Sequence, residues 1–276
     1  MADIAIITGA TGGIGLEFVK AIHLLDEIDE IWAVGRNSEK LNYLKEEYEK
    51  VIPIKADFSM DGVSVLAERI EENNPNIRIL INNAGIAHMG AFEKMQKEDV
   101  EGICKINCSA PSILISSVLP YMRAGARVLN IASASSFQPN PYLSMYSASK
   151  VFLKNLSRAL SVELKPRGIT VTAVCPGWVD TGMLPKEKNG RSIRYVGMVK
   201  PNVVVKKALR DSCRGKDISV PGLFAKYFRF YSKITPTRLV MKQWVSIIKK
   251  LSTPFFYYPC SYYMTEGKTD TPFMSS

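Results

Sequence analysis

The feature that most constrains the fold of this chain is a regular alternation of short β-branched apolar runs with longer amphipathic stretches. Short apolar runs predict buried strands, and apolar residues at helical spacing predict helices. We expect strands over residues 3–8, 31–34, 51–56, 77–81, 127–131, 169–175 and 218–220. We expect helices over residues 14–25, 38–49, 63–72, 99–119 and 144–164, and another that ends at residue 213. This alternation requires right-handed crossovers and a parallel sheet with helices on both faces.

The same pattern sets the domain organisation. No Pro-, Gly- or Ser-rich linker divides the chain, and no segment repeats at a fixed period. We therefore expect an α/β fold with a Rossmann-type, doubly wound parallel sheet in a single domain over residues 1–220. Residues 221–276, which are basic and rich in aromatic side chains, are expected to form a helical C-terminal appendage.

Composition excludes several classes of protein. With 276 residues, 46% of them hydrophobic and 22% charged, the chain is neither disordered nor collagen-like. No run reaches the roughly 18 consecutive apolar residues that span a bilayer, and we expect no signal peptide at the N-terminus. The five cysteines are scattered and lack the spacing of metal ligands, so we expect reduced thiols, no metal site and a cytoplasmic protein.

The positive charge is concentrated in one region. The net charge is +10, and residues 186–250 contain 17 Lys and Arg against three acidic residues. That region therefore carries +14 and the rest of the chain −4. Such asymmetry favours an anionic partner, for which a phosphorylated cofactor, an acidic substrate, a membrane surface and nucleic acid are the candidates. A basic face that is simply solvated explains the charge equally well. We expect no binding to nucleic acid, because no recognised binding module is present.

A glycine-rich segment, Thr8–Gly15, joins the first expected strand to the first expected helix. Glycines there permit a tight turn and close approach of the backbone to a pyrophosphate, and the helix N-terminus favours negative charge. The alternative is an ordinary glycine-rich loop. The candidate phosphate-binding residues are Gly9, Thr11, Gly13, Ile14 and Gly15.

Six motifs that follow one another along the chain resemble those of the short-chain dehydrogenase/reductase family. They are Gly9-x-x-x-Gly13-x-Gly15, Asn82-Asn83-Ala84-Gly85, Asn107, Ser133, Tyr146-x-x-x-Lys150 and Pro176-Gly177. The resemblance covers about residues 3–220. It implies a nicotinamide-dependent oxidoreductase, similar to hydroxysteroid dehydrogenases and 3-oxoacyl reductases, whose long helices pair into a homodimer or homotetramer.

The expected catalytic residues are Asn107, Ser133, Tyr146 and Lys150. Tyr146 and Lys150 are four positions apart, so on a helix they share one face. A nearby ammonium favours phenolate, and we expect Lys150 to lower the pKa of the Tyr146 phenol from about 10 toward neutral pH. Ser133 can hydrogen-bond the substrate oxygen. The resemblance implies that Lys150 also holds the ribose hydroxyls of the cofactor, and that Asn107 supports a water that passes protons onward.

The end of the second strand indicates which cofactor binds. An NAD enzyme is expected to place an acidic residue there for the ribose 2′-hydroxyl, whereas this chain has Arg36, whose guanidinium can fork onto a 2′-phosphate. This predicts NADP(H), with a surface arginine that meets no ligand as the alternative. The resemblance implies an adenine contact from Asp57, for which a turn aspartate is the alternative. Further implied cofactor contacts come from Asn83, Tyr146, Lys150, Pro176, Gly177 and Thr181.

These residues favour an NADPH-dependent oxidoreductase that interconverts a ketone and a secondary alcohol. Residues 183–198 are expected to cover the substrate, and they mix apolar side chains with Lys186, Lys188, Arg191 and Arg194. This mixture suits a hydrophobic carbonyl or alcohol substrate with an anionic end, and we favour a steroid or bile acid. The first alternative is a 3-oxoacyl thioester reductase of fatty-acid metabolism. The second is a non-catalytic nucleotide-binding sensor or scaffold.

The appendage over residues 221–276 has two interpretations. Aromatic and basic residues mix over 223–231, and Thr235-Pro236 is expected to end one helix and begin another. The helices either pack over the substrate entrance or a neighbouring subunit, or they lie in a membrane interface. In the second case the cytoplasmic protein is peripheral to a membrane. Truncation after Gly222 is expected to spare cofactor binding and to impair turnover or solubility.

Overall fold

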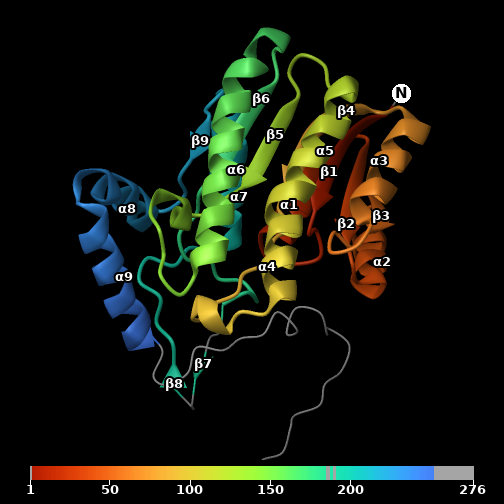
Figure 1. Cartoon of the computed structure of the whole chain (residues 1–276). Coiled ribbons are helices and arrows are strands. Elements are labelled where there is room, and N and C mark those ends of the chain that lie inside the picture. The colour runs from red at the N-terminus through yellow and green to blue at the C-terminus, as the bar shows by residue number, and fades with distance from the viewer. Residues whose placement is uncertain (1, 185–186, 189–190, 252–276) are drawn as a thin grey trace, which may run out of the picture.

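The structure is a computed structural model that describes residues 2–184, 187–188 and 191–251. Its centre is a seven-stranded parallel sheet with the strand order β3-β2-β1-β4-β5-β6-β9 (Figure 1). The strands are β1 (Asp3–Thr8), β2 (Glu30–Gly35), β3 (Val51–Lys55), β4 (Asn76–Asn82), β5 (Arg127–Ile131), β6 (Thr170–Val174) and β9 (Ile218–Ser219). The strand order reverses between β1 and β4, where doubly wound sheets bind their ligands at the carboxyl ends of the strands. The Rossmann-type sheet expected from the sequence is confirmed.

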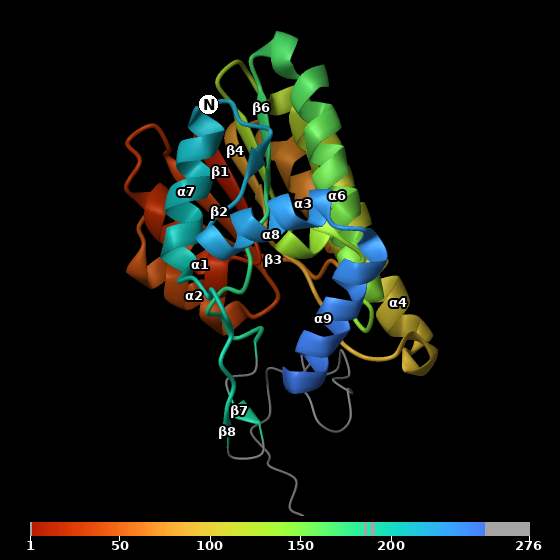
Figure 2. The same ribbon diagram turned by 90° about the vertical axis from the view of Figure 1, so that its left-hand side faces the viewer.

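Helices cover both faces of this sheet (Figure 2). One face carries α1 (Gly13–His23), α2 (Ser38–Glu47) and α7 (Pro201–Cys213). The other face carries α3 (Gly62–Asn73), α4 (Lys97–Cys104), α5 (Ala110–Val118) and α6 (Ser144–Glu163). Two further helices, α8 (Leu223–Ile234) and α9 (Thr237–Leu251), come from the expected appendage. Two short strands that the sequence did not predict, β7 (Glu187–Lys188) and β8 (Arg191–Ser192), pair antiparallel outside the main sheet.

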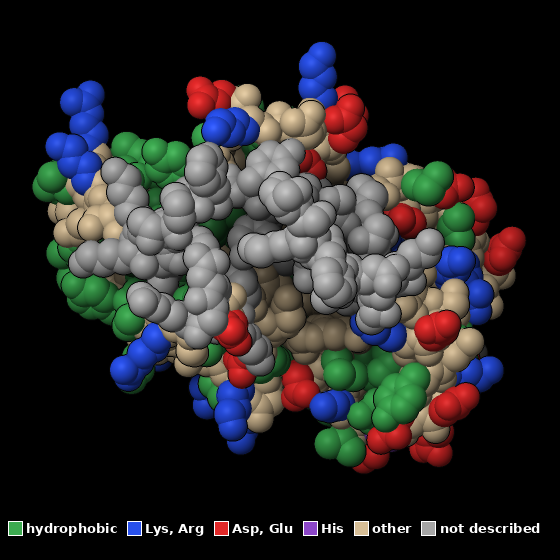
Figure 3. All heavy atoms as spheres, turned by 90° about the horizontal axis from the view of Figure 1, so that it is seen from below, with side chains coloured by type: hydrophobic (Ala, Val, Ile, Leu, Met, Phe, Trp, Pro, Cys, Tyr) green, Lys and Arg blue, Asp and Glu red, His purple; other side chains and the backbone are tan. Residues whose placement is uncertain are grey.

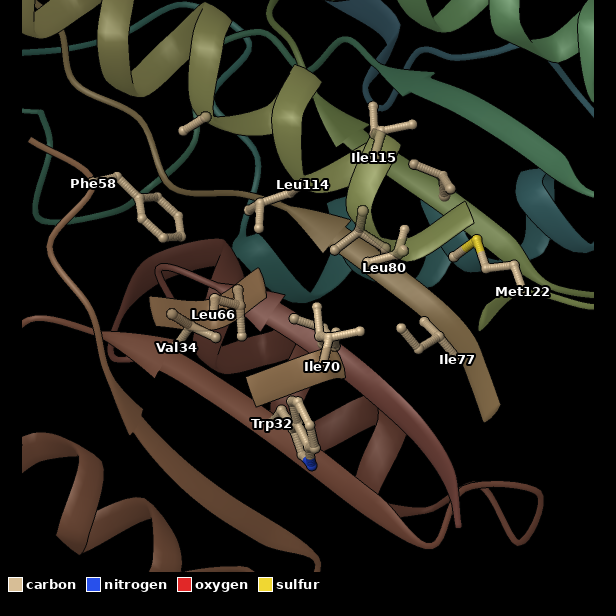
Figure 4. Close-up of a cluster of buried hydrophobic side chains, with 14 of the residues drawn as sticks. Trp32, Val34, Phe58, Leu66, Ile70, Ile77, Leu80, Leu114, Ile115 and Met122 are labelled. Carbon is tan, nitrogen blue, oxygen red and sulfur yellow. The ribbon is translucent and has the colours of Figure 1, made fainter. Parts of the chain in front are cut away.

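The alternation of side chains along the strands builds two cores, one on each face of the sheet. In β1, Ile4 and Ile6 belong to one core, and Ala5 and Ile7 belong to the other. Figure 4 shows the first core, where strand side chains such as Trp32 face side chains of α3 and α5. A sheet that is buried on both faces needs nearly continuous apolar strands, which explains the runs seen in the sequence.

The long helix expected over residues 99–119 is not uniform. α4 ends at Cys104, a π-helical turn spans Lys105–Ser109, and α5 begins at Ala110. By length and composition alone, the stretch Lys97–Tyr121 could cross a membrane. In this fold 44% of its most apolar window is buried, and its apolar side chains contribute to the first core. Turns of the π type are frequent at functional sites, and this one contains a predicted catalytic residue.

The C-terminal helices follow the break expected at Thr235-Pro236. α8 ends at Ile234 and α9 begins at Thr237, so this prediction is confirmed. α8 packs against the turn Ala134–Phe137 that follows β5, where the guanidinium of Arg229 lies 5.9 Å from the centroid of the Phe137 ring. α9 then turns toward the edge at which the strands end (Figure 1). Residues 252–276 of the expected appendage lie outside the described residues.

A buried carboxylate joins α7 to the last strand. The Asp211 carboxylate accepts hydrogen bonds from the Lys207 ammonium (2.6 Å), the Lys216 ammonium (3.1 Å) and the Ser219 hydroxyl (2.7 Å). Burial by itself raises the pKa of this carboxyl, but the three hydrogen bonds outweigh it and lower the pKa from 3.8 to about 2. Asp211 therefore holds the short strand β9 at the edge of the sheet.

We expect Asp211→Asn to lower the free energy of unfolding by about 2 kcal/mol at neutral pH. A carboxyl with a lower pKa in the folded state stabilises the fold above its unfolded pKa, and this contribution is lost as the pH falls toward the folded pKa. The difference between variant and wild type should therefore be constant above about pH 5 and fall to roughly half by pH 3. Urea denaturation of both proteins across this range measures it. A difference that does not change down to pH 3 contradicts the assignment.

Candidate active site

Three glycines in the loop between β1 and α1 leave little or no room for a side chain. Gly9 and Gly13 have φ angles of 64° and 53°, in the left-handed region that favours glycine. A Cβ atom on Gly15 would lie 2.1 Å from the carbonyl oxygen of Gly9, and one on Gly13 would lie 3.0 Å from the Thr181 methyl group. The loop is therefore a backbone cradle at the N-terminus of α1, where Ile14 also lies, and Thr181 packs against it.

Asn83 fixes the position of this cradle relative to β4. Its side-chain amide donates to the carbonyl oxygens of Thr8 and Gly9, each at 3.0 Å. In return, the Thr8 hydroxyl oxygen accepts hydrogen bonds from the backbone N–H groups of Asn83 (2.9 Å) and Ala84 (3.0 Å). The Asn-Asn-Ala-Gly motif therefore joins the ends of the two strands that flank the crevice. Asn83 acts on the loop backbone, which the sequence did not predict.

Strand β2 ends beside the same loop. The backbone N–H of Ala10 donates to the carbonyl oxygen of Val34 (3.1 Å), and the Thr11 methyl group would lie 3.1 Å from a Cβ atom on Gly35. Arg36 follows Gly35 directly and its side chain is exposed. The fold therefore places Arg36 at the end of β2, which ends beside the glycine-rich loop, and its contact with a 2′-phosphate stays a prediction.

Three other predicted cofactor contacts follow β3 and β6. Asp57 follows β3, and its Oδ1 accepts hydrogen bonds from the backbone N–H (2.8 Å) and hydroxyl (2.6 Å) of Ser59. This is the geometry of a turn aspartate, and contact with adenine stays a prediction. After β6, the Pro176 carbonyl oxygen accepts a hydrogen bond from the backbone N–H of Ala134 (2.7 Å). Gly177 faces α8.

The predicted catalytic side chains come together at the carboxyl ends of β4 and β5. Tyr146 and Lys150 lie on α6, and the Tyr146 phenol is hydrogen-bonded to Ser133, which follows β5. The Lys150 ammonium donates to the carbonyl oxygen of Ile131 (2.8 Å) and lies 5.6 Å from the centroid of the Tyr146 ring. The Ser133 hydroxyl oxygen also accepts from the backbone N–H of Ser135 (3.1 Å). This second bond holds the hydroxyl in place beside the phenol.

The expected effect of Lys150 on Tyr146 is wrong for this structure. Burial raises the pKa of the Tyr146 phenol above 10, and the hydrogen bond with Ser133 offsets only part of that increase. Burial also lowers the pKa of Lys150 to about 8. The physical reason is that both groups are deprived of water, which disfavours the charged form of each. The buried pair therefore favours a neutral phenol, which is the form that donates a proton.

Asn107 lies in the π-helical turn and is almost completely buried. Its side-chain amide donates to the Ile86 carbonyl oxygen (2.9 Å) and to the Ser149 hydroxyl (3.0 Å), and its Oδ1 accepts from the Ile86 N–H (2.9 Å). A Cβ atom on Gly85 would lie 3.2 Å from the Lys150 ammonium and 3.3 Å from the Asn107 Oδ1. Asn107 therefore holds the segment after β4 against α6, close to Lys150. Its role in proton transfer stays a prediction.

An apolar cluster from four parts of the chain lies next to Tyr146. It consists of buried Leu143, Trp244 and Ile248, with Met89, Tyr146 and Trp178 packed against them. The indoles of Trp178 and Trp244 stack with ring centroids 6.1 Å apart, and Tyr195 lies 5.0 Å from Trp178. The Trp244 indole N–H donates to the Pro141 carbonyl oxygen (2.9 Å). We call Met89, Leu143, Trp178, Trp244 and Ile248 the roof cluster.

One polar pair near this region had no role in the sequence interpretation. His88 and Asp99 are both buried, and the His88 Nδ1 lies 3.2 Å from the Asp99 Oδ2. The imidazole follows the Asn-Asn-Ala-Gly motif and the carboxylate lies in the first turn of α4. Their separation in sequence hides the pair from any local pattern. Among the described residues, no three His, Cys, Asp or Glu side chains form a group that could hold a metal ion.

Comparison with known sequences agrees with these motifs. Residues 3–192 match the family model described as short chain dehydrogenase. The chain is 34% identical over 188 residues to a 3-oxoacyl-[acyl-carrier-protein] reductase of Rickettsia bellii, covering 66% of this chain and 75% of that protein. It is 31% identical over 188 residues to the inactive hydroxysteroid dehydrogenase-like protein 1 of Homo sapiens, covering 65% of this chain and 56% of that protein.

A solved structure has the same architecture. A short-chain dehydrogenase from Sphingobium yanoikuyae, in complex with NADPH, superimposes with a TM-score of 0.71 at 25% sequence identity, covering 91% of this chain and 97% of that one. The family match spans the glycine-rich loop, the strand ends and the segment of α6 that carries Tyr146 and Lys150. This chain therefore belongs to the short-chain dehydrogenase/reductase family of oxidoreductases.

Proposed function

We propose that this oxidoreductase uses NADP(H) to interconvert a ketone and a secondary alcohol on a bulky hydrophobic substrate. The observation that carries the proposal is the buried Ser133–Tyr146–Lys150 group, which lies between the glycine-rich cradle and the apolar roof cluster. The side of the cradle contains backbone and cationic groups, and the side of the roof cluster contains aromatic side chains. Residues that donate a proton lie between the two.

The residues at the crevice fit a nicotinamide dinucleotide with a 2′-phosphate. Cβ atoms on Gly9 and Gly15 would collide with Asn83 and the loop backbone, so only glycines allow this tight turn at the N-terminus of α1, a position that suits a pyrophosphate. Exposed Arg36 would contact the 2′-phosphate, and Lys150 would hold the ribose hydroxyls. When bound, the reduced cofactor supplies hydride. The NADPH complex of the Sphingobium yanoikuyae relative supports this choice.

The protein side chains manage the proton and the orientation of the substrate. In the reductive direction, the Tyr146 hydroxyl donates its proton to the carbonyl oxygen as that oxygen gains negative charge. The Ser133 hydroxyl donates a hydrogen bond to the same oxygen and holds the carbonyl in place. Lys150, whose pKa is lowered to about 8, can return a proton toward Tyr146 near neutral pH. Asn107 would keep the water path to Lys150 open from its position in the π-helical turn.

The roof cluster favours a flat, rigid hydrophobic substrate. Trp178 and Trp244 stack with their planes only 16° apart, and Leu143 and Met89 complete an apolar surface over Tyr146. Trp244 and Leu143 are buried within the cluster, so a fused-ring ketone such as a steroid or bile acid would lie against the partly exposed Trp178 and Met89. A rigid substrate of this kind loses little conformational entropy on binding. Of the cationic residues expected over the substrate, Arg194 is exposed, whereas Lys186 and the side chains of Lys188 and Arg191 lie outside the described residues.

A 3-oxoacyl thioester is the second candidate substrate. The 34% identity to a 3-oxoacyl-[acyl-carrier-protein] reductase supports it, and an acyl chain would also lie against an apolar roof. Initial rates of NADPH consumption with a panel of steroid ketones, oxo bile acids and 3-oxoacyl thioesters distinguish the two. Activity confined to small polar sugars contradicts a hydrophobic substrate of either kind. Activity with none of the panel while NADPH still binds supports a nucleotide-binding sensor instead.

We expect Trp244→Ala to raise KM for a bulky hydrophobic ketone by roughly tenfold, with a smaller effect on kcat. The indole contributes apolar surface beside Tyr146 but no group that takes part in the reaction, so the lost energy is mainly that of substrate binding. Steady-state kinetics with the best ketone of the panel measures the change. Leu239→Ala on the same helix, at an exposed position, is the matched control. An unchanged KM in Trp244→Ala contradicts a role for α9 in covering the substrate.

We also propose that the protein is a homo-oligomer in the cytoplasm. α5 and α6 expose Ile113 (50%) and Phe152 (45%), apolar side chains that pairing of the long helices in a homodimer or homotetramer would cover. Size-exclusion chromatography with light scattering tests this, and a monomer at micromolar concentration contradicts it. With no disulfide pattern in the sequence, the cytoplasm is the expected compartment.

A further inference from the structure

We propose that α8, together with the basic cavity beside it, is a docking surface for a membrane that contains anionic lipid. This inference goes beyond the oxidoreductase activity, because the surface contains none of the predicted catalytic side chains. The exposed face of α8 would meet the bilayer, whereas α9 packs beside Tyr146 through Trp244 and Ile248.

The first observation is an exposed apolar stripe along α8. Leu223, Tyr227, Phe230 and Ile234 are 82%, 62%, 62% and 65% exposed, respectively. Their spacing of four, three and four residues places them on one face of the helix. The opposite face packs on the body of the protein through buried Ala225, which faces Gly177. Single exposed apolar side chains are common on protein surfaces, but a contiguous stripe of large ones marks a contact surface.

The second observation is a basic cavity that borders this stripe. A cavity of about 320 Å³ lies between α7, β9 and α8, and Phe230 contributes to both the stripe and the cavity wall. Its cationic lining residues are Lys207, Lys216, Lys226, Arg229 and Lys233. The one carboxylate in the wall, Asp211, is already bonded to Lys207 and Lys216. The cavity therefore has an excess of four positive charges beside an apolar edge.

The cations on α8 itself are not neutralised within the described part of the chain. No acidic side chain among those residues forms an ion pair with Lys226, Arg229 or Lys233. The sequence from residue 218 to residue 251 contains no Asp or Glu at all. In Figure 3, hydrophobic side chains and Lys or Arg gather on the side of the molecule where α8 and α9 lie in Figure 1.

This combination fits an anionic lipid surface better than other partners. The stripe can enter the boundary between headgroups and acyl chains, while the lysines beside it extend to the phosphates. Each Lys or Arg near an anionic leaflet contributes about 1 kcal/mol of attraction. A second copy of this chain docked symmetrically through the same face would instead bring two positive cavities together. Like charges therefore oppose self-association at this surface.

Vesicle co-flotation of the full-length protein tests the proposal. Vesicles of phosphatidylcholine mixed with phosphatidylglycerol, an anionic lipid, should bind the wild type, and vesicles of phosphatidylcholine alone should bind it much more weakly. Raising the salt should release part of the bound protein, since surface attraction is screened. The double variant Lys226→Glu/Lys233→Glu should lower the partition coefficient at least about tenfold. Tyr227→Ser/Phe230→Ser should lower it by a similar factor.

The matched controls make the same kinds of substitution, Lys to Glu and apolar to Ser, at exposed positions outside α8. Lys45→Glu/Lys97→Glu changes two exposed lysines on other helices, and Leu24→Ser/Met60→Ser changes two exposed apolar side chains. Both controls should float like the wild type, and all variants should keep the NADPH-binding affinity of the wild type. Equal binding to neutral vesicles, or α8 variants that float like the controls, overturns the proposal. So does a change of oligomeric state in the α8 variants without vesicles, which would identify the face as a subunit interface.

Discussion

Replacing Tyr146 with phenylalanine should lower kcat by roughly 10²- to 10⁴-fold, the usual contribution of a positioned general acid, while NADPH binds as before. The substitution removes only the phenolic oxygen, which is hydrogen-bonded to Ser133. The ring itself, which lies under the Lys150 ammonium and beside the roof cluster, is retained. The reaction then lacks its proton donor although the pocket keeps its shape. Initial rates and a fluorescence titration with NADPH measure the two effects separately.

The controls for this experiment exclude a change in folding. Tyr43→Phe removes the same atom from an exposed position on α2 and should leave kcat unchanged. The melting temperature of Tyr146→Phe should stay close to that of the wild type, because the lost hydrogen bond is offset by relief from burying a polar group. Full activity in Tyr146→Phe would remove Tyr146 from the mechanism. Loss of NADPH binding would mean that it is needed for the cofactor site instead.

The second large effect is expected at Arg36. Arg36→Asp should lower the ratio of kcat/KM with NADPH to kcat/KM with NADH by about 30-fold or more, because a charge-assisted contact with a phosphate contributes roughly 2 kcal/mol. The new carboxylate repels the 2′-phosphate and can accept a hydrogen bond from the 2′-hydroxyl of NADH. The position at the end of β2, next to Gly35 and Thr11, makes the effect specific to that end of the cofactor.

The control for Arg36 is a charge reversal on the next helix. Lys45→Asp introduces the same negative charge on exposed α2 and should leave the cofactor ratio near the wild-type value. A wild-type enzyme that prefers NADH refutes the cofactor assignment outright. An unchanged ratio in Arg36→Asp means that another residue recognises the phosphate.

The sequence predicted the elements whose own residues determine them. Strand β5 was expected over residues 127–131 and occupies those residues, because it contains the apolar residues Val128, Leu129 and Ile131 and follows the turn residue Gly125. The break at Thr235-Pro236 was also correct, since a proline restricts the residue before it. The π-helical turn at Lys105–Ser109 could not be predicted, because it depends on how Asn107 bonds to Ile86 after folding.

The site was only partly predictable for a related reason. The spacing of four residues was enough to predict that Tyr146 and Lys150 share one face of a helix. Their pKa values depend on burial, which cannot be read from the spacing. The expected lowering of the Tyr146 pKa ignored the loss of water around both groups, and the structure reverses its sign. Likewise, the sequence predicted that helices of the appendage could pack over the substrate entrance, but it did not predict that α9 contacts Met89 and Leu143. Those contacts join residues far apart in the chain.

The position of Trp244 has a consequence for how this protein is made. The glycine-rich cradle is synthesised before Trp244 and Ile248, which lie more than 220 residues later in the chain. At roughly 5–20 residues per second, synthesis of the intervening segment takes tens of seconds or less, during which the earlier domain can begin to fold. A nascent chain can therefore acquire its nucleotide crevice before Tyr146 is shielded by α9. A chain that stops between α8 and α9 would contain the complete sheet and the glycine-rich loop, but Tyr146 would lack the cover of Trp244 and Ile248.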